Sequence, residues 1–327
     1  MPELQMREAL RAAMTEEMER DDNVFLIGEE VAEYNGAYKV SEGMLDQFGP
    51  RRIIDTPISE NGFTGMCIGA SLRGLRPVVE YMTWNFAFVA IDQIINNAAK
   101  IRYMSGGQLK VPIVFRGANG AAGQLGATHS TAVESIYSVF PGLKVVSVSN
   151  PDDAYGLLKS SIRDDDPVVF LESEVMFGLK GEVTLGADRL IPLGEARIGR
   201  EGSDVTIVGW NKSYWRAMEA AEELARQGIE AEVIDPRTIR PLDIGAIVRS
   251  VRKTNRLVII DEANPFASVA AEITHQVQQH AFDALDAPVT RVTAQDIPAP
   301  YAKNLIEAYV PGARQVVEAA RAVCYAN

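Results

Sequence analysis

The chain has 327 residues and a formal net charge of −12. Domains commonly hold about 100–200 residues, so this length predicts two domains. The acidic balance and the lack of any Lys/Arg cluster argue against a nucleic-acid partner. The only cysteines, Cys67 and Cys324, exclude a disulfide framework and indicate a reducing compartment. No signal peptide and no apolar segment of about 18 residues is present, so we expect a cytoplasmic protein outside the membrane; a processed organellar form would have the same features.

The first half of the chain alternates helical and strand patterns, which is typical of a parallel α/β fold. Helices are expected over residues 6–20, 45–48, 64–72, 91–104 and 155–162. Strands are expected over residues 24–28, 76–82, 111–115, 143–148 and 168–172, and from residue 53 onward.

The stretch from Ile53 to Phe63 combines a strand, a tight turn and the start of a helix. Ser59 is a suitable N-cap, and Glu60 falls in the first helical turn. The simplest interpretation of Glu60 is a carboxylate that complements the helix dipole. Another strand leads into residues 29–38, a loop dense in acids and tyrosines, and such loops lie at the carboxyl edge of a parallel sheet, where ligands bind.

A second candidate site is the loop over residues 116–130, which has four glycines in ten residues and then His129. Such a run is too flexible to serve packing alone and is typical of a binding loop. An imidazole at this position can face a ligand and exchange protons near neutral pH. The other two histidines, His275 and His280, fall in a polar helix and are expected on a solvated face.

Residues 164–166 are three aspartates in a turn. The usual interpretation is a solvated turn, and the alternative is a cation held by backbone carbonyls. Residues 177–199 lack periodicity and are expected to contain a linker. Beyond them, strands over residues 204–209, 232–234, 257–260 and 289–292 and helices over 214–227, 244–251 and 269–280 predict a second parallel α/β domain. No catalytic constellation appears in this half, so scaffold and partner binding are its expected roles.

The common phosphate-binding, serine-nucleophile and zinc motifs are absent from the sequence. What remains is Glu60, an apolar loop containing Met82, Trp84 and Phe86, and His129. A carboxylate, an apolar wall and one imidazole can hold a planar heterocycle and shuttle a proton. They cannot hold a diphosphate, because no metal or anion site accompanies them.

A series of short segments runs along the chain: GEEV (28–31), GAYKV (36–40), RIIDTPISENGF (52–63), IDQIIN (91–96), YMSGG (103–107), VPIVFRG (111–117), HS (129–130), PGLKVV (141–146) and VT (292–293). Through these segments, in this order, the sequence resembles along essentially its whole length the beta subunits of the thiamine-diphosphate-dependent 2-oxo acid dehydrogenases, most closely those of the pyruvate dehydrogenase type. The resemblance implies two parallel-sheet α/β domains. These are a transketolase-like pyrimidine-binding domain over residues 1–180, a linker over 181–200, and a transketolase C-terminal-like domain over 201–327 for subunit assembly and acyltransferase docking.

The resemblance also implies roles for individual residues. Glu60 is the carboxyl group hydrogen-bonded to the aminopyrimidine of thiamine diphosphate, where it favours the imino tautomer that takes the proton from the thiazolium carbon. Met82 and Phe86 pack against the aminopyrimidine, and Ile58 is an apolar cofactor contact. His129 matches the active-site histidine that binds the substrate carboxylate region or manages protons during acyl transfer.

A structural potassium site is implied as well, formed by main-chain carbonyls of Ile113, Ser161, Asp164 and Asp166. Residues 121–125 depart from the commonest form of the loop before the histidine, and Trp84 stands where relatives often have another aromatic residue. The preferred 2-oxo acid therefore stays open at this point.

The missing diphosphate site has an explanation in the resemblance. An alpha subunit brings the magnesium and diphosphate motif, which implies two alpha and two beta subunits docked on a dihydrolipoyl acetyltransferase core. The implied reaction decarboxylates pyruvate and reductively acetylates a lipoyl group. The alternatives are an acetoin or branched-chain 2-oxo acid dehydrogenase beta subunit, a non-catalytic scaffold, and a stand-alone transketolase-like enzyme.

Overall fold

The chain forms two compact units in a computed structural model that describes residues 1–326. Unit 1 comprises Met1–Asn119 and Ile136–Leu193. Unit 2 comprises Gly120–Ser135 and the chain from Gly194 onward. Each unit has its own sheet, and each is described by itself.

The main sheet of unit 1 is parallel throughout these strands, in the order β6-β7-β5-β4-β2-β3. Their bounds are β2 (Val24–Gly28), β3 (Ile53–Asp55), β4 (Arg76–Thr83), β5 (Val114–Ala118), β6 (Lys144–Ser147) and β7 (Val168–Glu172). The inner strands are buried on both faces, which explains why their sequences are continuous apolar runs without alternation.

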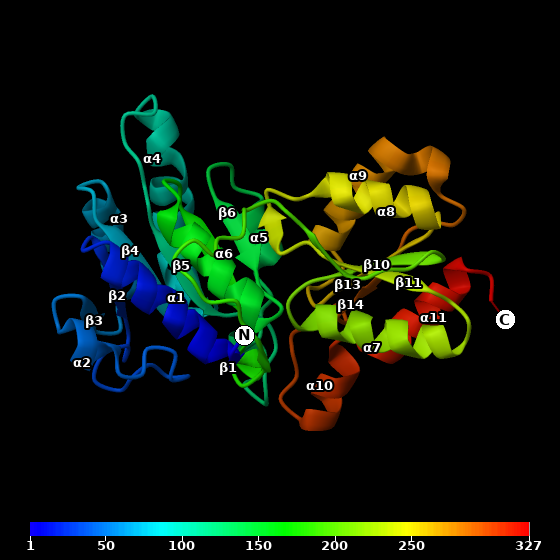
Figure 1. Cartoon of the computed structure of the whole chain (residues 1–327), viewed down its shortest axis with the longest axis horizontal. Coiled ribbons are helices and arrows are strands. Elements are labelled where there is room, and N and C mark those ends of the chain that lie inside the picture. The colour runs from blue at the N-terminus through cyan, green and yellow to red at the C-terminus, as the bar shows by residue number, and fades with distance from the viewer. Residues whose placement is uncertain (327) are drawn as a thin grey trace. The chain divides into compact units, whose positions relative to one another are not determined.

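Helices complete unit 1. They are α1 (Met6–Arg20), α2 (Met44–Phe48), α3 (Glu60–Ser71), α4 (Ala99–Met104), α5 (Glu134–Ser138) and α6 (Pro151–Arg163), with the short turns η1 (Phe86–Ala90), η2 (Gln93–Ala98) and η4 (Glu174–Met176). The helices α1 and α6 lie side by side, and α3 packs against β4 (Figure 1). A small antiparallel pair joins β1 (Glu3–Gln5) to β8 (Lys180–Glu182).

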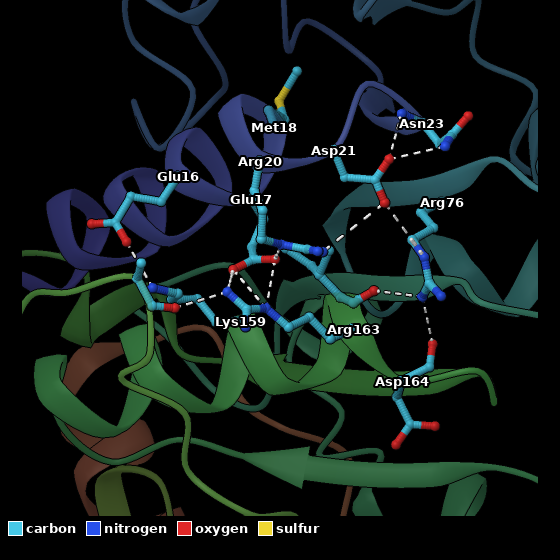
Figure 2. A network of polar contacts seen from close by, with 12 residues as sticks. Glu16, Glu17, Met18, Arg20, Asp21, Asn23, Arg76, Lys159, Arg163 and Asp164 are labelled. Carbon is cyan, nitrogen blue, oxygen red and sulfur yellow. Dashed lines mark hydrogen bonds and ion pairs between the residues drawn. The ribbon is translucent and has the colours of Figure 1, made fainter.

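Charged residues fasten α1 to α6. The carboxylate of Glu17 is fully buried and accepts hydrogen bonds from Arg163 at 2.7–3.0 Å. The ammonium of Lys159, also fully buried, lies 2.7 Å from Glu16 (Figure 2). A buried charge is tolerated only when it is paired, so these contacts fix the register of the two helices.

Unit 2 has a sheet in the order β14-β13-β10-β11-β9, parallel except for β9 at one edge. In Figure 1, α8 and α9 cover one face of this sheet, and α7 and α11 cover the other. The strand bounds are β9 (Arg197–Arg200), β10 (Val205–Gly209), β11 (Ala231–Asp235), β12 (Thr238–Arg240), β13 (Leu257–Asp261) and β14 (Thr290–Thr293). The helix bounds are η3 (Ala127–His129), α7 (Lys212–Arg226), α8 (Ile244–Thr254), α9 (Val269–Ala281), η5 (Phe282–Ala284), α10 (Lys303–Tyr309) and α11 (Ala313–Val323).

Most predicted elements occur in the structure, and the differences have physical causes. The helix α3 starts at Glu60 with Ser59 at the N-cap position, as predicted, but the Ser59 side chain makes no capping hydrogen bond. The stretch expected as a linker contains the short strands β8 and β9. Both strands are only 3–4 residues long, which is too short to give a periodic pattern. Among the described residues, no helix is long and apolar enough to cross a membrane.

Candidate functional site

Three neighbouring strands of unit 1 bring the predicted residues to one edge of the sheet. Gly28 at the end of β2 pairs in register with Asp55 of β3 and with Glu80 of β4. Glu29 directly follows β2, and Glu60 begins α3 after a short turn from β3. Because the strands are parallel, both glutamates follow carboxyl ends at the same edge, where open α/β sheets bind ligands.

The loop that carries Glu29 is held in place by backbone contacts. The carboxylate of Asp55 accepts hydrogen bonds from the amides of Ala32 at 2.7 Å and Glu33 at 3.0 Å. A Cβ atom on Gly28 would lie 2.5 Å from the carbonyl oxygen of Glu80, so only glycine fits between the two strands. The turn before Glu29 is therefore tightly determined.

Glu29 and Glu60 form a buried carboxyl pair. Each residue is only 7% exposed. Burial raises the pKa of Glu29 to about 7, and the charge of Glu60 and a hydrogen bond between the two carboxyl groups add to this shift. The Oε1 atom of Glu29 is buried and has no hydrogen-bond partner among the described residues. Glu29 therefore takes up or releases a proton near neutral pH, and its Oε1 atom is a polar group that a ligand can satisfy.

The other predicted contact residues have different exposures. Met82, near the end of β4, and Phe86, at the start of η1, are half-buried. Ile58, in the turn before α3, is 87% exposed in this chain. An exposed apolar side chain of this size is available to a ligand or a second chain.

An aromatic cluster lies within unit 1 next to the strand that carries Met82. The Tyr81 ring centroid is 5.9 Å from that of Phe63 and 5.5 Å from that of Trp84, and Trp84 is 4.9 Å from Tyr137. The Tyr81 and Thr64 hydroxyls are 2.6 Å apart, which joins β4 to α3. Trp84, predicted as part of the apolar wall, is fully buried in this cluster and supports the site from within.

A buried ionic triad crosses the middle of the same sheet. Arg116 on β5 pairs with Glu80 on β4 and, at 2.6 Å, with Glu172 on β7. All three side chains are at most 5% exposed. Burial raises the pKa of Glu172, while the charge of Arg116 opposes that rise. The triad fixes the relative positions of the central strands at the end that leads into the site.

His129 lies in unit 2, on the segment Gly120–Ser135. Its side chain is half-buried, and its Nδ1 atom is 2.9 Å from the Thr128 hydroxyl. The amide of His129 donates to the carbonyl of Gly126 at 3.2 Å, and the Ser130 hydroxyl donates to the same carbonyl at 2.8 Å. The two other histidines, His275 and His280, are exposed on α9, which confirms the expectation of a solvated face.

The residues predicted for a potassium site lie on adjoining segments of unit 1. The Ile113 carbonyl accepts from the Val168 amide at 2.9 Å, and the Ser161 carbonyl accepts from the Asp164 amide at 3.3 Å. The Asp164 carbonyl accepts from Arg76 at 3.0 Å (Figure 2). These carbonyls each keep a second lone pair for a cation.

The aspartate side chains of the same turn are neutralised by protein cations. Lys144 lies 2.6 Å from the carboxylate of Asp164 and 3.4 Å from that of Asp166. Asp166 also pairs with Arg102. These carboxylates are thus occupied, and a cation at this turn depends on main-chain oxygens.

Unit 1 fits half of thiamine diphosphate. The buried carboxyl groups of Glu29 and Glu60, with the unsatisfied Oε1 atom of Glu29, suit the ring nitrogen and amino group of an aminopyrimidine. For the diphosphate and its metal, the described residues contain no group of three or more His, Cys, Asp or Glu side chains placed to hold an ion.

Comparisons with known proteins identify the family of this chain. Residues 2–178 match the family model "Transketolase, pyrimidine binding domain", and residues 194–316 match "Transketolase, C-terminal domain". The chain is 54% identical over 323 residues to the pyruvate dehydrogenase E1 component subunit beta of Rickettsia conorii, covering 99% of each chain. The chain belongs to the pyruvate dehydrogenase E1 beta-subunit family.

Other relatives support the same assignment. The family member from Rhizobium meliloti is 53% identical over 99% of this chain and 71% of its own length. The mitochondrial beta-2 subunit of Oryza sativa is 53% identical over 99% of this chain and 87% of its own length. A solved structure described as a split-gene transketolase, inactive beta4 tetramer, has a TM-score of 0.81 at 22% identity and covers 98% of this chain and 99% of that one, which shows the shared fold.

The predicted family and fold class are thus confirmed, with the refinement that β9 makes the second sheet mixed. Residue reasoning missed Glu29 as a partner of Glu60. The signal that could have found it is the pair of acids in the segment 28–31 directly after a buried strand, because such a position meets the end of the neighbouring strand.

Proposed function

We propose that this chain provides the aminopyrimidine half of a thiamine diphosphate site in a pyruvate dehydrogenase, with Glu60 as the carboxyl group that acts on the cofactor ring. The observation that carries the proposal is the buried Glu29–Glu60 pair at the carboxyl edge of a parallel sheet. When bound, thiamine diphosphate would supply a nucleophilic thiazolium carbon for the 2-oxo carbon and a cationic ring that accepts the electrons released by decarboxylation.

Glu60 holds the proton that the aminopyrimidine nitrogen needs in its reactive tautomer. Its carboxyl group lies within a buried site, where a shared proton moves with little solvent reorganisation. Because its pKa is raised to about 7, Glu29 has similar populations of the protonated and ionised forms near neutral pH. It thereby limits the negative charge beside Glu60 and keeps that proton exchangeable.

The remaining roles are those that the family resemblance implies, and the exposures of the side chains are compatible with them. Met82 and Phe86 supply apolar contacts to the ring, and Ile58 supplies another from the turn before α3. His129 binds the carboxylate region of the 2-oxo acid or manages protons as the acyl group leaves. Loop residues of this kind are suited to such work because a rigid scaffold carries them.

An alpha subunit would complete the site with the magnesium ion and the diphosphate contacts. The assembly we propose has two alpha and two beta subunits, docked through the C-terminal domain on a dihydrolipoyl acetyltransferase core. A potassium ion bound by carbonyls of Ile113, Ser161, Asp164 and Asp166 would stabilise unit 1. The domain bounds of 1–180 and 201–327 and the cytoplasmic location also remain predictions.

Substrate comparison tests this function. The chain, reconstituted with its alpha subunit, would be assayed with pyruvate, acetoin and 3-methyl-2-oxobutanoate at matched concentrations. We expect the highest kcat/KM for pyruvate, since relatives at 53–54% identity are named for it. Equal or higher kcat/KM for either alternative would replace pyruvate as the substrate while leaving the cofactor site intact.

A further inference from the structure

The loop that carries His129 is fastened at its base by an ion pair from the second unit's own sheet. Lys212 and Glu262 lie 2.6 Å apart, with side-chain exposures of only 15% and 10%. Neither residue belongs to the sites described above, and the sequence had indicated no functional constellation in this half of the chain.

Both members of the pair bind the same backbone residue. The Oε1 atom of Glu262 accepts a hydrogen bond from the amide of Ala121. The ammonium of Lys212 donates to the carbonyl of Ala121. Both polar groups of one peptide residue are thus held by charged partners, and charge-assisted hydrogen bonds are about twice as strong as neutral ones.

The pair is mounted on rigid elements. Glu262 directly follows β13, and Lys212 is the first residue of α7, after β10. The strands β10 and β13 are hydrogen-bonded neighbours. The buried carboxylate of Asp261 accepts from the amides of Ala263 at 2.9 Å and Ala270 at 3.3 Å, which fixes the turn that presents Glu262. The ion pair therefore has a defined position relative to the sheet of unit 2.

The loop sequence is adapted to this contact. Gly120 has a φ of +76°, and a Cβ atom there would lie 2.7 Å from one carboxylate oxygen of Glu262 and 2.8 Å from the other. Glycine is required on both grounds. The amide of Gly120 also donates to the carbonyl of Thr131 at 3.2 Å, which closes the loop at its base.

The base and the tip of the loop differ in exposure. Ala121 is buried in a small cluster with Ala294, Ala299 and Tyr309. Residues 123–125 are exposed, and His129 is half-buried. A loop fixed at its base and free at its tip holds a side chain near the base in place while the tip can adapt to a ligand.

We propose that Lys212 and Glu262 are positioning residues: they clamp Gly120 and Ala121 and thereby set the position of His129 for the reaction. The inference rests on the proposed role of His129. Misplacing a reacting group by about 1 Å can cost about 100-fold in rate.

The test uses the full chain reconstituted with its alpha subunit. Lys212→Met and the double variant Lys212→Met/Glu262→Gln would be compared with the wild type. The double variant avoids an unpaired buried carboxylate, which alone can unfold a protein. Lys253→Met is the control matched to Lys212→Met. It also leaves a buried carboxylate in the same unit, that of Glu232, without its lysine partner, but Lys253 has no contact with the loop among the described contacts.

Two readouts separate positioning from general stability. Hydrogen exchange of the peptide covering residues 120–131, measured without substrate, should accelerate at least about 10-fold in both Lys212 variants, which corresponds to about 1.4 kcal/mol of lost local stability. The kcat/KM for pyruvate should fall about 10- to 100-fold. Lys212→Arg, which keeps the cation, should restore most of both, and Lys253→Met should change neither.

Unchanged exchange in the loop of a folded double variant would overturn the clamp. Faster exchange with wild-type kcat/KM would overturn its link to His129. Failure of the proposed function itself has a different signature, because the wild-type complex would then show no turnover of pyruvate while the exchange result still reports on the clamp.

Discussion

At the scale of single residues, the proposed chemistry depends on two carboxyl groups that are buried together, although burying one costs less free energy than burying two. Glu29 and Glu60 are both buried, and two like charges in such surroundings cannot both ionise at low cost. Burial, with the neighbouring charge of Glu60 and a hydrogen bond to it, raises the pKa of Glu29 to about 7, so Glu29 can be protonated near neutral pH. The buried carboxyl group of Glu29 lowers the stability of the folded state as the pH rises. It also supplies an exchangeable proton where the cofactor ring is proposed to lie.

Replacing Glu29 by Gln should change how stability depends on pH. A carboxyl group whose pKa is raised on folding stabilises the native state fully below its unfolded pKa of about 4.5. That contribution is lost as the pH rises through about 7. The unfolding free energy of Glu29→Gln, relative to wild type, should therefore increase between pH 5 and pH 8 in denaturant titrations. The control is Glu30→Gln, at the exposed neighbouring residue. If the difference in unfolding free energy between Glu29→Gln and the wild type did not change with pH, the raised pKa of Glu29 would be contradicted.

At the scale of secondary-structure elements, the site depends on where strands end and what fixes them there. The triad of Arg116, Glu80 and Glu172 ties β4, β5 and β7 together in a fully buried layer. The fit of Gly28 against the carbonyl of Glu80 then sets β2 beside β4. The side chains at the edge are thus positioned by contacts that the strands make before they end.

Removal of the triad's cation should be costly. Arg116→Met leaves two buried carboxylates without a partner, and we expect a loss of about 3–5 kcal/mol in unfolding free energy. The control is Arg216→Met, whose partner Glu219 is 54% exposed and whose loss should cost less than about 1 kcal/mol. Urea titrations of both variants measure the difference, and similar costs would show that the triad adds no more than a surface pair.

Much of the fold could be predicted from patterns along the sequence, and the reasons are local. The helix α1 and the strands β2 and β7 have the predicted bounds, because their apolar spacing is long and uninterrupted. The site was only half predictable. His129 stands out by its local context, whereas the local context of Glu60 indicates only a helix-dipole partner and its proposed role comes from the family resemblance. The pairing of Glu29 with Glu60 and of Lys212 with Glu262 depends on contacts between segments distant in the chain.

The segment 86–98 shows the same limit at element scale. The apolar spacing predicts one helix through Ile91 and Ile94, whereas the structure has a 3-10 turn, η1, and then a π-helical segment, η2, before α4. Periodicity reports which face is apolar but not whether each turn holds three, four or five residues, and π segments occur often near functional sites.

At the scale of the whole molecule, the chain holds only part of what its chemistry needs. Unit 1 offers a carboxyl pair and apolar contacts, and unit 2 offers a histidine on a clamped loop. The described residues contain no group of three or more His, Cys, Asp or Glu side chains that could hold a metal ion. The pyruvate dehydrogenase E1 beta relatives imply an alpha-subunit partner, which we propose as the source of the metal and diphosphate contacts.

The isolated chain and its complex with an alpha subunit should bind thiamine diphosphate with different affinities. Thiamine diphosphate with magnesium should bind the isolated chain more weakly than about 1 mM, since the ring contacts alone supply only a few kcal/mol. The complex with the alpha subunit should bind it far more tightly. Isothermal titration calorimetry on both samples checks this, and tight binding by the isolated chain would favour the stand-alone transketolase-like alternative.

Glu60→Gln tests the proposed action of Glu60 on the thiamine diphosphate ring. In the reconstituted complex loaded with thiamine diphosphate, exchange of the proton on the thiazolium carbon for deuterium would be followed together with pyruvate turnover. The control is Glu272→Gln, which removes an exposed carboxylate from the first turn of α9 and so reproduces a simple helix-dipole role. We predict that Glu60→Gln retains the cofactor and slows both rates at least about 100-fold. If the Glu60→Gln complex bound the cofactor and kept wild-type rates, the proposed role of Glu60 would be contradicted.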